Sequence, residues 1–308
     1  MINFGGIEYI HIKFLWKERI NRNKKISIIC GDLRLVYLAN IWQQDGFEVY
    51  TYGLERSSQI ADNFSIAKCD TLNRCIESSD IIISSMPFTN DDIYIKESFS
   101  NEKVKIEELT RYLKEKTFIA GNIPEKFYEL IQHKNIKVID LMKNEELAIL
   151  NSISTVEGAI KIAIEETNET IHGSNILILG FGRIGKILAK TLSGMGANVF
   201  CEARKMEDLA WITTYGYNKI PLKNLSENLS KFDIIFNTIP NIILDAEKLK
   251  LIKKSTLIID LASKPGGVEQ EAAKDLGLKM VWALAIPGKI APKSAAKIIK
   301  QTIEHELR

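Results

Sequence analysis

The sequence contains the segment Asn175-Ile-Leu-Ile-Leu-Gly-Phe-Gly-Arg-Ile-Gly185, in which an apolar run of strand length leads into a Gly-x-Gly-x-x-Gly motif. Helical periodicity follows directly over 186–192. A glycine-rich turn between a strand and a helix is what dinucleotide-binding folds use to hold a pyrophosphate. Gly180 permits the tight turn, Gly182 lets backbone amides approach the phosphates, and Gly185 allows the helix to pack closely on the strand.

Short apolar runs alternate with helical stretches along the rest of the chain, which is typical of parallel α/β sheets. The length of 308 residues supports about two domains. We therefore predict an α/β protein with two doubly wound Rossmann-like domains and an interdomain cleft. The expected strands are 26–31, 47–52, 81–84, 117–120 and 137–140 in the first half, and 175–180, 198–202, 232–237, 256–260 and 279–282 in the second.

The predicted boundaries follow from this pattern. Residues 1–22 form a leader outside the scheme, 23–150 the substrate-side Rossmann-like domain, 151–292 the dinucleotide-binding Rossmann domain, and 293–308 a C-terminal helix that packs back on the first domain. Near the boundary, Ser154 and Glu157 have the spacing of a capping box, which predicts a helix beginning there.

Composition narrows the classes of partner. Lys and Arg number 41 against 39 Asp and Glu, a net charge of +2, so no global field attracts nucleic acid or an anionic membrane. No uninterrupted apolar run approaches the roughly 18 residues of a membrane span. The four cysteines form no Cys-x-x-Cys pair, and the four histidines lack metal-ligand spacing. We expect a cytoplasmic protein without a metal site.

The choice of dinucleotide depends on the end of the strand after the motif, where NAD-specific folds carry an acidic residue about 20 residues on. Counted from Gly185, that position falls at Ala203, which leaves room for a 2′-phosphate. Arg204 and Lys205 follow and supply cationic donors. This pattern favours NADP over NAD, with Glu202 interpreted as facing away.

The other cofactor-binding candidates lie at the carboxyl ends of predicted strands, where ligands bind open α/β sheets. They are Gly180, Gly182, Arg183, Ile184 and Gly185 in the glycine-rich turn, Asn237, Thr238, Ile239 and Pro240 after the third strand of this domain, and Ala262 after the fourth.

Candidate substrate contacts occupy similar positions in both halves. Arg34 follows the first strand and can hold a carboxylate with two hydrogen bonds, although it could instead pair with Asp32 only to fix the loop. Lys264 lies in a glycine-containing loop that could also be a simple tight turn. The complete substrate-binding set is Asp32, Arg34, Thr89, Asn122, Ser152, Thr155, Lys264 and Lys289.

Several motifs, in this order along the chain, resemble the family of the dipicolinate synthase A subunit. They are Asn151-Ser-Ile-Ser-Thr-Val-Glu-Gly158, 171–174 with the glycine-rich turn, Ala203-Arg204, Asn237-Thr-Ile-Pro240, 259–267, Pro287-Gly288 and Ala291-Pro-Lys293. The resemblance covers about 25–300 and departs from the family at 1–22 and through much of 54–135.

The resemblance implies an NADP-dependent oxidoreductase that oxidises dihydrodipicolinate to dipicolinate with the flavoprotein-like B subunit of dipicolinate synthase, in the mother cell of a sporulating bacterium. For a flat dicarboxylate of this kind, we hypothesise that Arg34, Lys264 and Lys289 hold the two carboxylates, with Lys264 and Lys289 as catalytic candidates. Glu157 is a third candidate, as proton acceptor, although its capping role is favoured. We further expect a homo-oligomer.

The two-domain layout also resembles the 2-hydroxyacid dehydrogenases, but their catalytic Arg and His would fall near Ser263 and 287–289, where this sequence has neither. Two alternatives stay open. One is an NADP-dependent 2-hydroxyacid or imine reductase that acts alone. The other is a non-catalytic scaffold that binds NADP within a larger complex.

Overall fold

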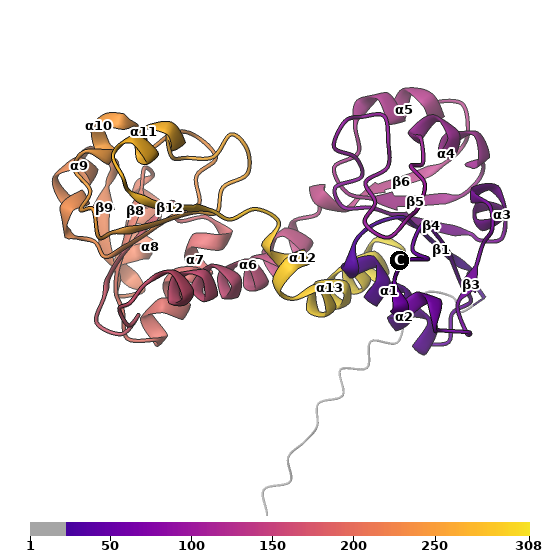
Figure 1. The fold of residues 1–308 in the computed structure, drawn as a ribbon, viewed down its shortest axis with the longest axis horizontal. Helices are drawn as coiled ribbons and strands as arrows, with labels where there is room; N and C mark the ends of the chain where they lie inside the picture. The colour runs from indigo at the N-terminus through magenta and orange to yellow at the C-terminus, as the bar shows by residue number, and fades with distance from the viewer. Residues whose placement is uncertain (1–22) are drawn as a thin grey trace, which may run out of the picture.

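A computed structural model describes residues 23–308 of the chain, so the leader predicted over 1–22 lies outside the described residues. The described chain forms two lobes, each built on a six-stranded parallel sheet with flanking helices (Figure 1). Each sheet has the strand order of a doubly wound fold, in which the first strand lies at the centre and successive strands are added on either side. The predicted fold class, two Rossmann-like α/β domains, is confirmed.

The first sheet has the order β3-β2-β1-β4-β5-β6, and the two central strands β1 and β4 are buried along their whole length. Prediction missed β3 because it spans only two residues, both exposed. The strands are β1 (Ile26–Ile29), β2 (Val49–Tyr52), β3 (Ala67–Lys68), β4 (Ile81–Ser84), β5 (Thr117–Ala120) and β6 (Lys137–Asp140). The helices are α1 (Leu33–Gln44), α2 (Ser58–Ala61), α3 (Leu72–Glu77), α4 (Ile106–Tyr112), α5 (Glu125–Ile131) and the 3-10 turn η1 (Leu141–Lys143).

The second sheet has the order β12-β11-β10-β7-β8-β9. The edge strand β9 was also missed, because it begins with exposed Asn218 and Lys219 and ends at Pro221. The strands are β7 (Asn175–Leu179), β8 (Asn198–Ala203), β9 (Asn218–Pro221), β10 (Ile234–Asn237), β11 (Leu257–Asp260) and β12 (Lys279–Trp282). The helices are α7 (Arg183–Gly194), α8 (Met206–Thr214), α9 (Leu225–Asn228), α10 (Ala246–Leu249) and α11 (Gln270–Asp275), with 3-10 turns η2 (Leu222–Asn224) and η3 (Leu229–Lys231).

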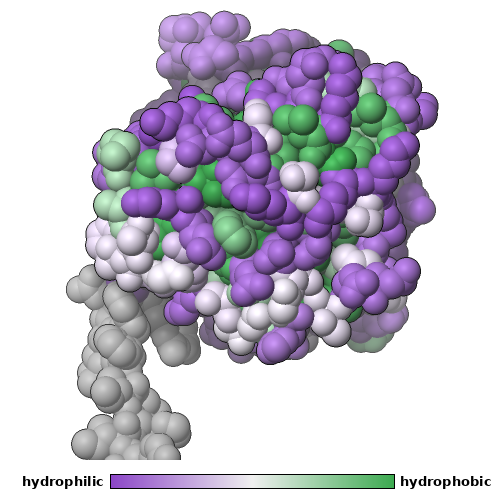
Figure 2. All heavy atoms as spheres, turned by 90° about the vertical axis from the view of Figure 1, so that its left-hand side faces the viewer, coloured by the Kyte–Doolittle hydropathy of each residue, from purple (hydrophilic) through white to green (hydrophobic). Residues whose placement is uncertain are grey.

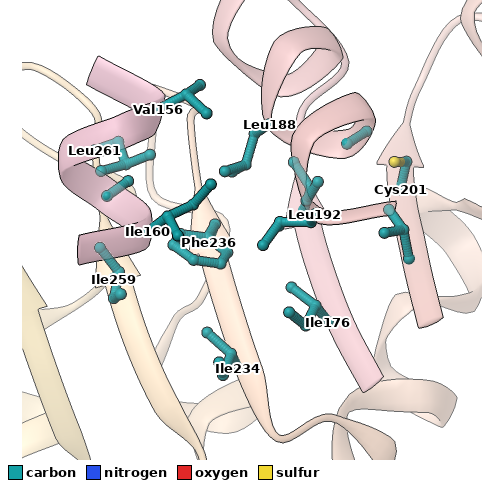
Figure 3. Packing of buried hydrophobic residues seen from close by; sticks show 14 of the residues in the cluster. Val156, Ile160, Ile176, Leu188, Leu192, Cys201, Ile234, Phe236, Ile259 and Leu261 are labelled. Carbon is teal, nitrogen blue, oxygen red and sulfur yellow. The ribbon is translucent and has the colours of Figure 1, made fainter. Parts of the chain in front are cut away.

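Helices α6 (Glu145–Glu166) and α7 cover one face of the second sheet. Val156 and Ile160 of α6 and Leu188 of α7 point into the core made by the central strands (Figure 3). At the end of this domain that faces away from the first, hydrophilic residues cover most of the surface and hydrophobic ones are visible between them (Figure 2).

The start of α6 corrects one expectation. The helix begins at Glu145, because the side chain of Asn144 accepts a hydrogen bond from the Leu147 amide and caps it there. Ser154 therefore lies inside the helix, where its hydroxyl donates to the Asn151 carbonyl, and the predicted capping box with Glu157 is wrong. The boundary expected between 150 and 151 falls inside this helix, in its second turn.

Helix α6 connects the two domains. Leu147 near its start belongs to the core of the first domain, and Ala159 and Ala163 belong to that of the second. Among the described residues, it is also the one helix long and apolar enough to cross a membrane by length and composition. A helix buried within its own protein shows the same profile.

Two further helices complete the connection. After β12 the chain forms α12 (Ile286–Ile290) against α6, and then α13 (Pro292–Glu306), which runs back to lie beside α1 (Figure 1). Ala296, Ile299 and Ile303 of α13 are buried in the core of the first domain. The last helix of the chain thus packs with the first domain.

Candidate functional site

A cleft of about 860 Å³ lies between the two domains. Its lining comes from the carboxyl ends of strands in both sheets and from α6 and α12, as doubly wound folds predict. The first domain and α6 contribute Asp32, Leu33, Arg34, Met86, Pro87, Lys96, Ser98, Phe99, Leu141, Met142, Leu147, Ala148, Asn151, Ser152 and Thr155. The second domain contributes Gly182, Arg183, Ile184, Thr238, Pro240, Leu261, Ala262, Ser263, Ala285, Pro287, Gly288 and Lys289.

The glycine-rich turn has the geometry of a phosphate cradle. Gly180 has φ +91°, and a Cβ there would lie 2.6 Å from Oγ1 of Thr238. A Cβ on Gly185 would lie 2.1 Å from the Gly180 carbonyl oxygen, so both positions need glycine. Gly182 precedes α7, and no side chain caps this helix start, so its first-turn N–H groups are available to an anion. The turn therefore fits a dinucleotide pyrophosphate.

The loops after β10 and β11 are fixed by a buried pair, Asn237 and Asp260. Nδ2 of Asn237 donates to Oδ1 of Asp260 at 2.7 Å and to the Ile239 carbonyl at 3.0 Å. The carboxylate of Asp260 also accepts from the amides of Ala262 and Gly267. Asn237, proposed from the sequence as a cofactor contact, is fully buried and orders these loops instead of lining the cleft.

The glycine-rich turn begins beside the end of β8, where the Gly180 amide donates to the Glu202 carbonyl at 3.2 Å. Ala203 is buried at the end of this strand, and Arg204 and Lys205 are exposed beyond it. Glu202 is fully buried, and neither carboxylate oxygen has a hydrogen-bond partner among the described residues. Burial raises the pKa of the Glu202 carboxyl, while the Gly180 backbone and the charge of Arg204 act in the opposite direction.

On the opposite wall, Arg34 is held by Asp32. Its Nε and Nη2 donate to the Asp32 carboxylate, Nη2 at 2.7 Å, and Nη2 also donates to the Met86 carbonyl. Nη1 makes no hydrogen bond within residues 23–308. The pairing of Arg34 with Asp32, which the sequence did not decide, is therefore present. It leaves Nη1 of Arg34 available for a ligand. Gly288 of α12 packs against this pair, because a Cβ there would lie 3.2 Å from Arg34 Nε.

Two lysines line the cleft without an ion-pair partner in the described chain, Lys289 on α12 and Lys96. Lys96 was missed from the sequence. It reaches the cleft because the segment around it pairs with the end of β1, where the Ser98 amide donates to the Gly31 carbonyl at 3.0 Å. No local sequence motif indicates such a tertiary contact.

The remaining candidates divide into two groups. Ser152 and Thr155 line the cleft from α6, as do six of the predicted cofactor contacts: Gly182, Arg183, Ile184, Thr238, Pro240 and Ala262. The candidates outside the lining are Thr89, Asn122, Glu157, Gly180, Gly185, Ala203, Arg204, Lys205, Asn237, Ile239 and Lys264. Of these, Glu157, Asn122 and Lys264 are exposed, and Thr89 is buried, with its hydroxyl accepting from the amides of Asp91 and Asp92.

The fold and the cleft together define a class. A phosphate cradle at the carboxyl edge of one Rossmann-like sheet opens into a cleft whose other wall, from a second such domain, carries cations. This is the arrangement of a two-domain oxidoreductase that uses a nicotinamide cofactor. Within residues 23–308, no group of three His, Cys, Asp or Glu residues is placed to hold a metal ion.

Comparison with known proteins narrows the class to a family. Residues 25–142 match the N-terminal domain of the dipicolinate synthase A subunit, and 153–274 match the NAD-binding domain of D-isomer specific 2-hydroxyacid dehydrogenases. The dipicolinate synthase A subunit of Bacillus subtilis (strain 168) is 34% identical over 282 residues, 91% of this chain and 94% of that protein. The chain belongs to the family of the dipicolinate synthase A subunit.

Solved structures support the same family assignment. The dipicolinate synthase A subunit from Bacillus halodurans superposes with a TM-score of 0.83 at 29% identity, covering 92% of this chain and 97% of that one. The corresponding protein from Bacillus subtilis gives 0.83 at 32% identity, with 94% and 97% covered. A transhydrogenase from Sinorhizobium meliloti shares the fold, with a TM-score of 0.66 at 18% identity and 92% and 94% covered.

Proposed function

We propose that this chain oxidises dihydrodipicolinate to dipicolinate with NADP+ as hydride acceptor, acting with the flavoprotein-like B subunit in the cytoplasm of a sporulating mother cell. The observation that carries the proposal is the cleft itself, which joins the phosphate cradle at Gly182 to Arg34, Lys96 and Lys289. These three cations, in addition to Arg183, which pairs with Glu145, suit a small dicarboxylate.

The proposed chemistry requires little from the protein beyond positioning. The nicotinamide ring supplies the hydride acceptor when the cofactor is bound. The N–H groups at the start of α7 hold the pyrophosphate, while Nη1 of Arg34 and Nζ of Lys289 orient the carboxylates. The ring gives up a hydride to the cofactor and a proton to solvent. Forming an aromatic ring favours the loss of that proton, so a strong general base is less necessary than in oxidising an alcohol. Accordingly, no histidine is among the described residues that line the cleft.

For the cofactor, we propose that NADP is preferred because Arg204 and Lys205 follow a small residue at the ribose position. Replacing Arg204 by Ala should raise the Kd for NADP at least tenfold, since a hydrogen bond to a charged group is worth about 1.5–3 kcal/mol and about 1.4 kcal/mol is a factor of ten. Titration of the chain with NADP and with NAD measures this effect. The Kd for NAD serves as the internal control and should stay within about twofold; equal weakening of both would contradict the assignment.

Turnover tests the proposed reaction. Freshly generated dihydrodipicolinate and NADP+ are mixed with the chain alone, with the flavoprotein-like partner alone, and with both, while nicotinamide reduction is followed by absorbance. We expect reduction that requires this chain and increases with the partner. Turnover of 2-hydroxy acids by the chain alone would favour the reductase alternative. Unchanged turnover by the complex after Arg34→Ala and Lys289→Ala would favour the scaffold.

A further inference from the structure

Asn151 on α6 is the only Asn or Gln among the described residues that line the cleft. Its side-chain amide makes no hydrogen bond to any described residue, and its Oδ1 is fully buried without a partner. Nδ2 is not buried, so this nitrogen is the end of the amide that a ligand in the cleft can reach. Because Nδ2 makes no hydrogen bond within residues 23–308, its N–H groups are available to a molecule bound in the cleft.

The neighbouring polar groups of α6 are already used. Ser152 donates its hydroxyl proton to the Ala148 carbonyl at 2.8 Å, and Thr155 donates to the Asn151 carbonyl at 3.0 Å. Thr155 lies one helical turn after Asn151 and lines the same cavity. The free N–H of Asn151 is therefore the donor that α6 offers to a bound molecule.

The surroundings indicate what kind of molecule fits. Met86, Pro87, Phe99 and Leu147 give the cavity apolar walls, which suit a flat ring, while the cations described above suit carboxylates. In a ring that carries a carboxylate on each side of its nitrogen, an imine or pyridine nitrogen presents a lone pair between the two charges. That nitrogen is an acceptor which neither Arg34 nor Lys289 needs to serve.

We propose that Nδ2 of Asn151 donates a hydrogen bond to the ring nitrogen of the substrate and so selects nitrogen heterocycles over carbocyclic diacids. This inference rests on the proposed function, and it makes Asn151 a specificity-determining residue. A site built to hydrogen-bond one ligand atom discriminates strongly against an analogue that lacks it, because a polar group is then left unpaired.

The test uses two diacids of nearly the same shape, pyridine-2,6-dicarboxylate and benzene-1,3-dicarboxylate, which differ at the ring nitrogen. Calorimetric titration of the NADP-loaded chain in metal-free buffer gives both Kd values. We expect the wild-type chain to bind the pyridine at least tenfold more tightly. Asn151→Ala and the closer-sized Asn151→Leu should lose that preference through weaker pyridine binding, with the benzene Kd changed less than about threefold.

Ser154→Ala is the matched control, because Ser154 is buried on the same helix, bonds to the Asn151 carbonyl and lies outside the cleft lining. It should keep the preference, and unchanged NADP binding by each variant shows that the fold is intact. If the Asn151 variants weaken the binding of both diacids equally, or change neither, the proposed role of Asn151 is overturned while the proposed function still stands. Failure of the wild-type chain to bind either diacid overturns the proposed function and this inference together.

Discussion

Arg34 uses only part of its guanidinium to hold the fold. Its Nε and Nη2 fasten the turn after β1 to Asp32 and Met86, while Nη1 stays available in the cleft. The sequence placed Arg34 and Asp32 at the correct end of a strand, because that position follows from the apolar run before them. The sequence left open which guanidinium nitrogens are hydrogen-bonded within the chain, because the Met86 carbonyl comes from a loop 52 residues away.

Lys289 and Lys264 offer a matched test of the carboxylate contacts, because both are exposed lysines of the second domain but only Lys289 lines the cleft. Lys289→Ala should raise the KM for dihydrodipicolinate about tenfold, the effect of one lost charge-assisted hydrogen bond. Lys264→Ala should change it less than about twofold. Steady-state kinetics at saturating NADP+ measures both. The reverse order of effects would assign the carboxylate to Lys264.

The buried carboxyl of Glu202 leads to a prediction about how the free energy of unfolding depends on pH. Because burial places the folded-state pKa above the unfolded one, the carboxyl holds its proton more tightly in the folded chain. Its stabilising contribution is therefore complete below the unfolded pKa and is lost as the pH rises through the folded pKa. Glu202→Met, which removes a buried unpaired carboxylate, should raise the free energy of unfolding at pH 8 by about 1–3 kcal/mol.

Urea unfolding from about pH 4.5 to pH 8 measures this gain, which should shrink toward the acid end. Glu207→Met removes an exposed carboxylate on α8 and should leave the stability nearly unchanged at every pH. A Glu202→Met chain that is less stable than wild type at pH 8 would mean that the carboxylate has a stabilising partner in solution.

Among the elements, α6 and α12 depend on Gly158 for their close contact. A Cβ at Gly158 would lie 2.2 Å from Cγ2 of Ile286 and 3.0 Å from Cγ1 of Ile290. Overpacking costs about 1–3 kcal/mol and alanine contributes roughly 1 kcal/mol to a helix, so Gly158→Ala should destabilise the chain by up to about 2 kcal/mol net. Because α12 carries Lys289, the same change should raise the KM for the dicarboxylate.

Gly194→Ala is the control for this change. Gly194 is also helical, at the end of α7, but a Cβ added there would meet nothing within 4 Å. Thermal unfolding should show it as neutral or stabilising. Similar destabilisation by both substitutions would show that the effect comes from the backbone and not from the contact between α6 and α12.

Which strands and helices the sequence predicted depends on the residues that form each of them. The ten predicted strands were found because each contains an apolar run, and this holds even for the edge strands β6 and β12. Strands β3 and β9 form the other two edges and were missed because they give no such signal: β3 has only two residues, both exposed, and β9 begins with exposed Asn218 and Lys219. The start of α6 was misplaced because Asn144 caps the helix upstream of the Ser154 and Glu157 pair, whose spacing also occurs inside helices.

For the whole molecule, the site depends on how the two domains are connected. Helices α6, α12 and α13 all pass between them, and α13 buries Ile299 and Ile303 against the first domain (Figure 1). This connection brings Gly288 of the second domain against Arg34 of the first. The sequence predicted each wall of the cleft from strand ends, but the approach of the walls, and with it Lys96 and Asn151, comes only from tertiary packing.

The most direct measurement of the central claim is a crystal structure of the chain with NADP+ and pyridine-2,6-dicarboxylate. The account predicts the pyrophosphate on the N–H groups at the start of α7, and the diacid in the cleft between the domains, with its carboxylates within hydrogen-bond distance of Arg34 and Lys289. A diacid bound outside the cleft, or a dinucleotide bound away from the glycine-rich turn, would contradict it.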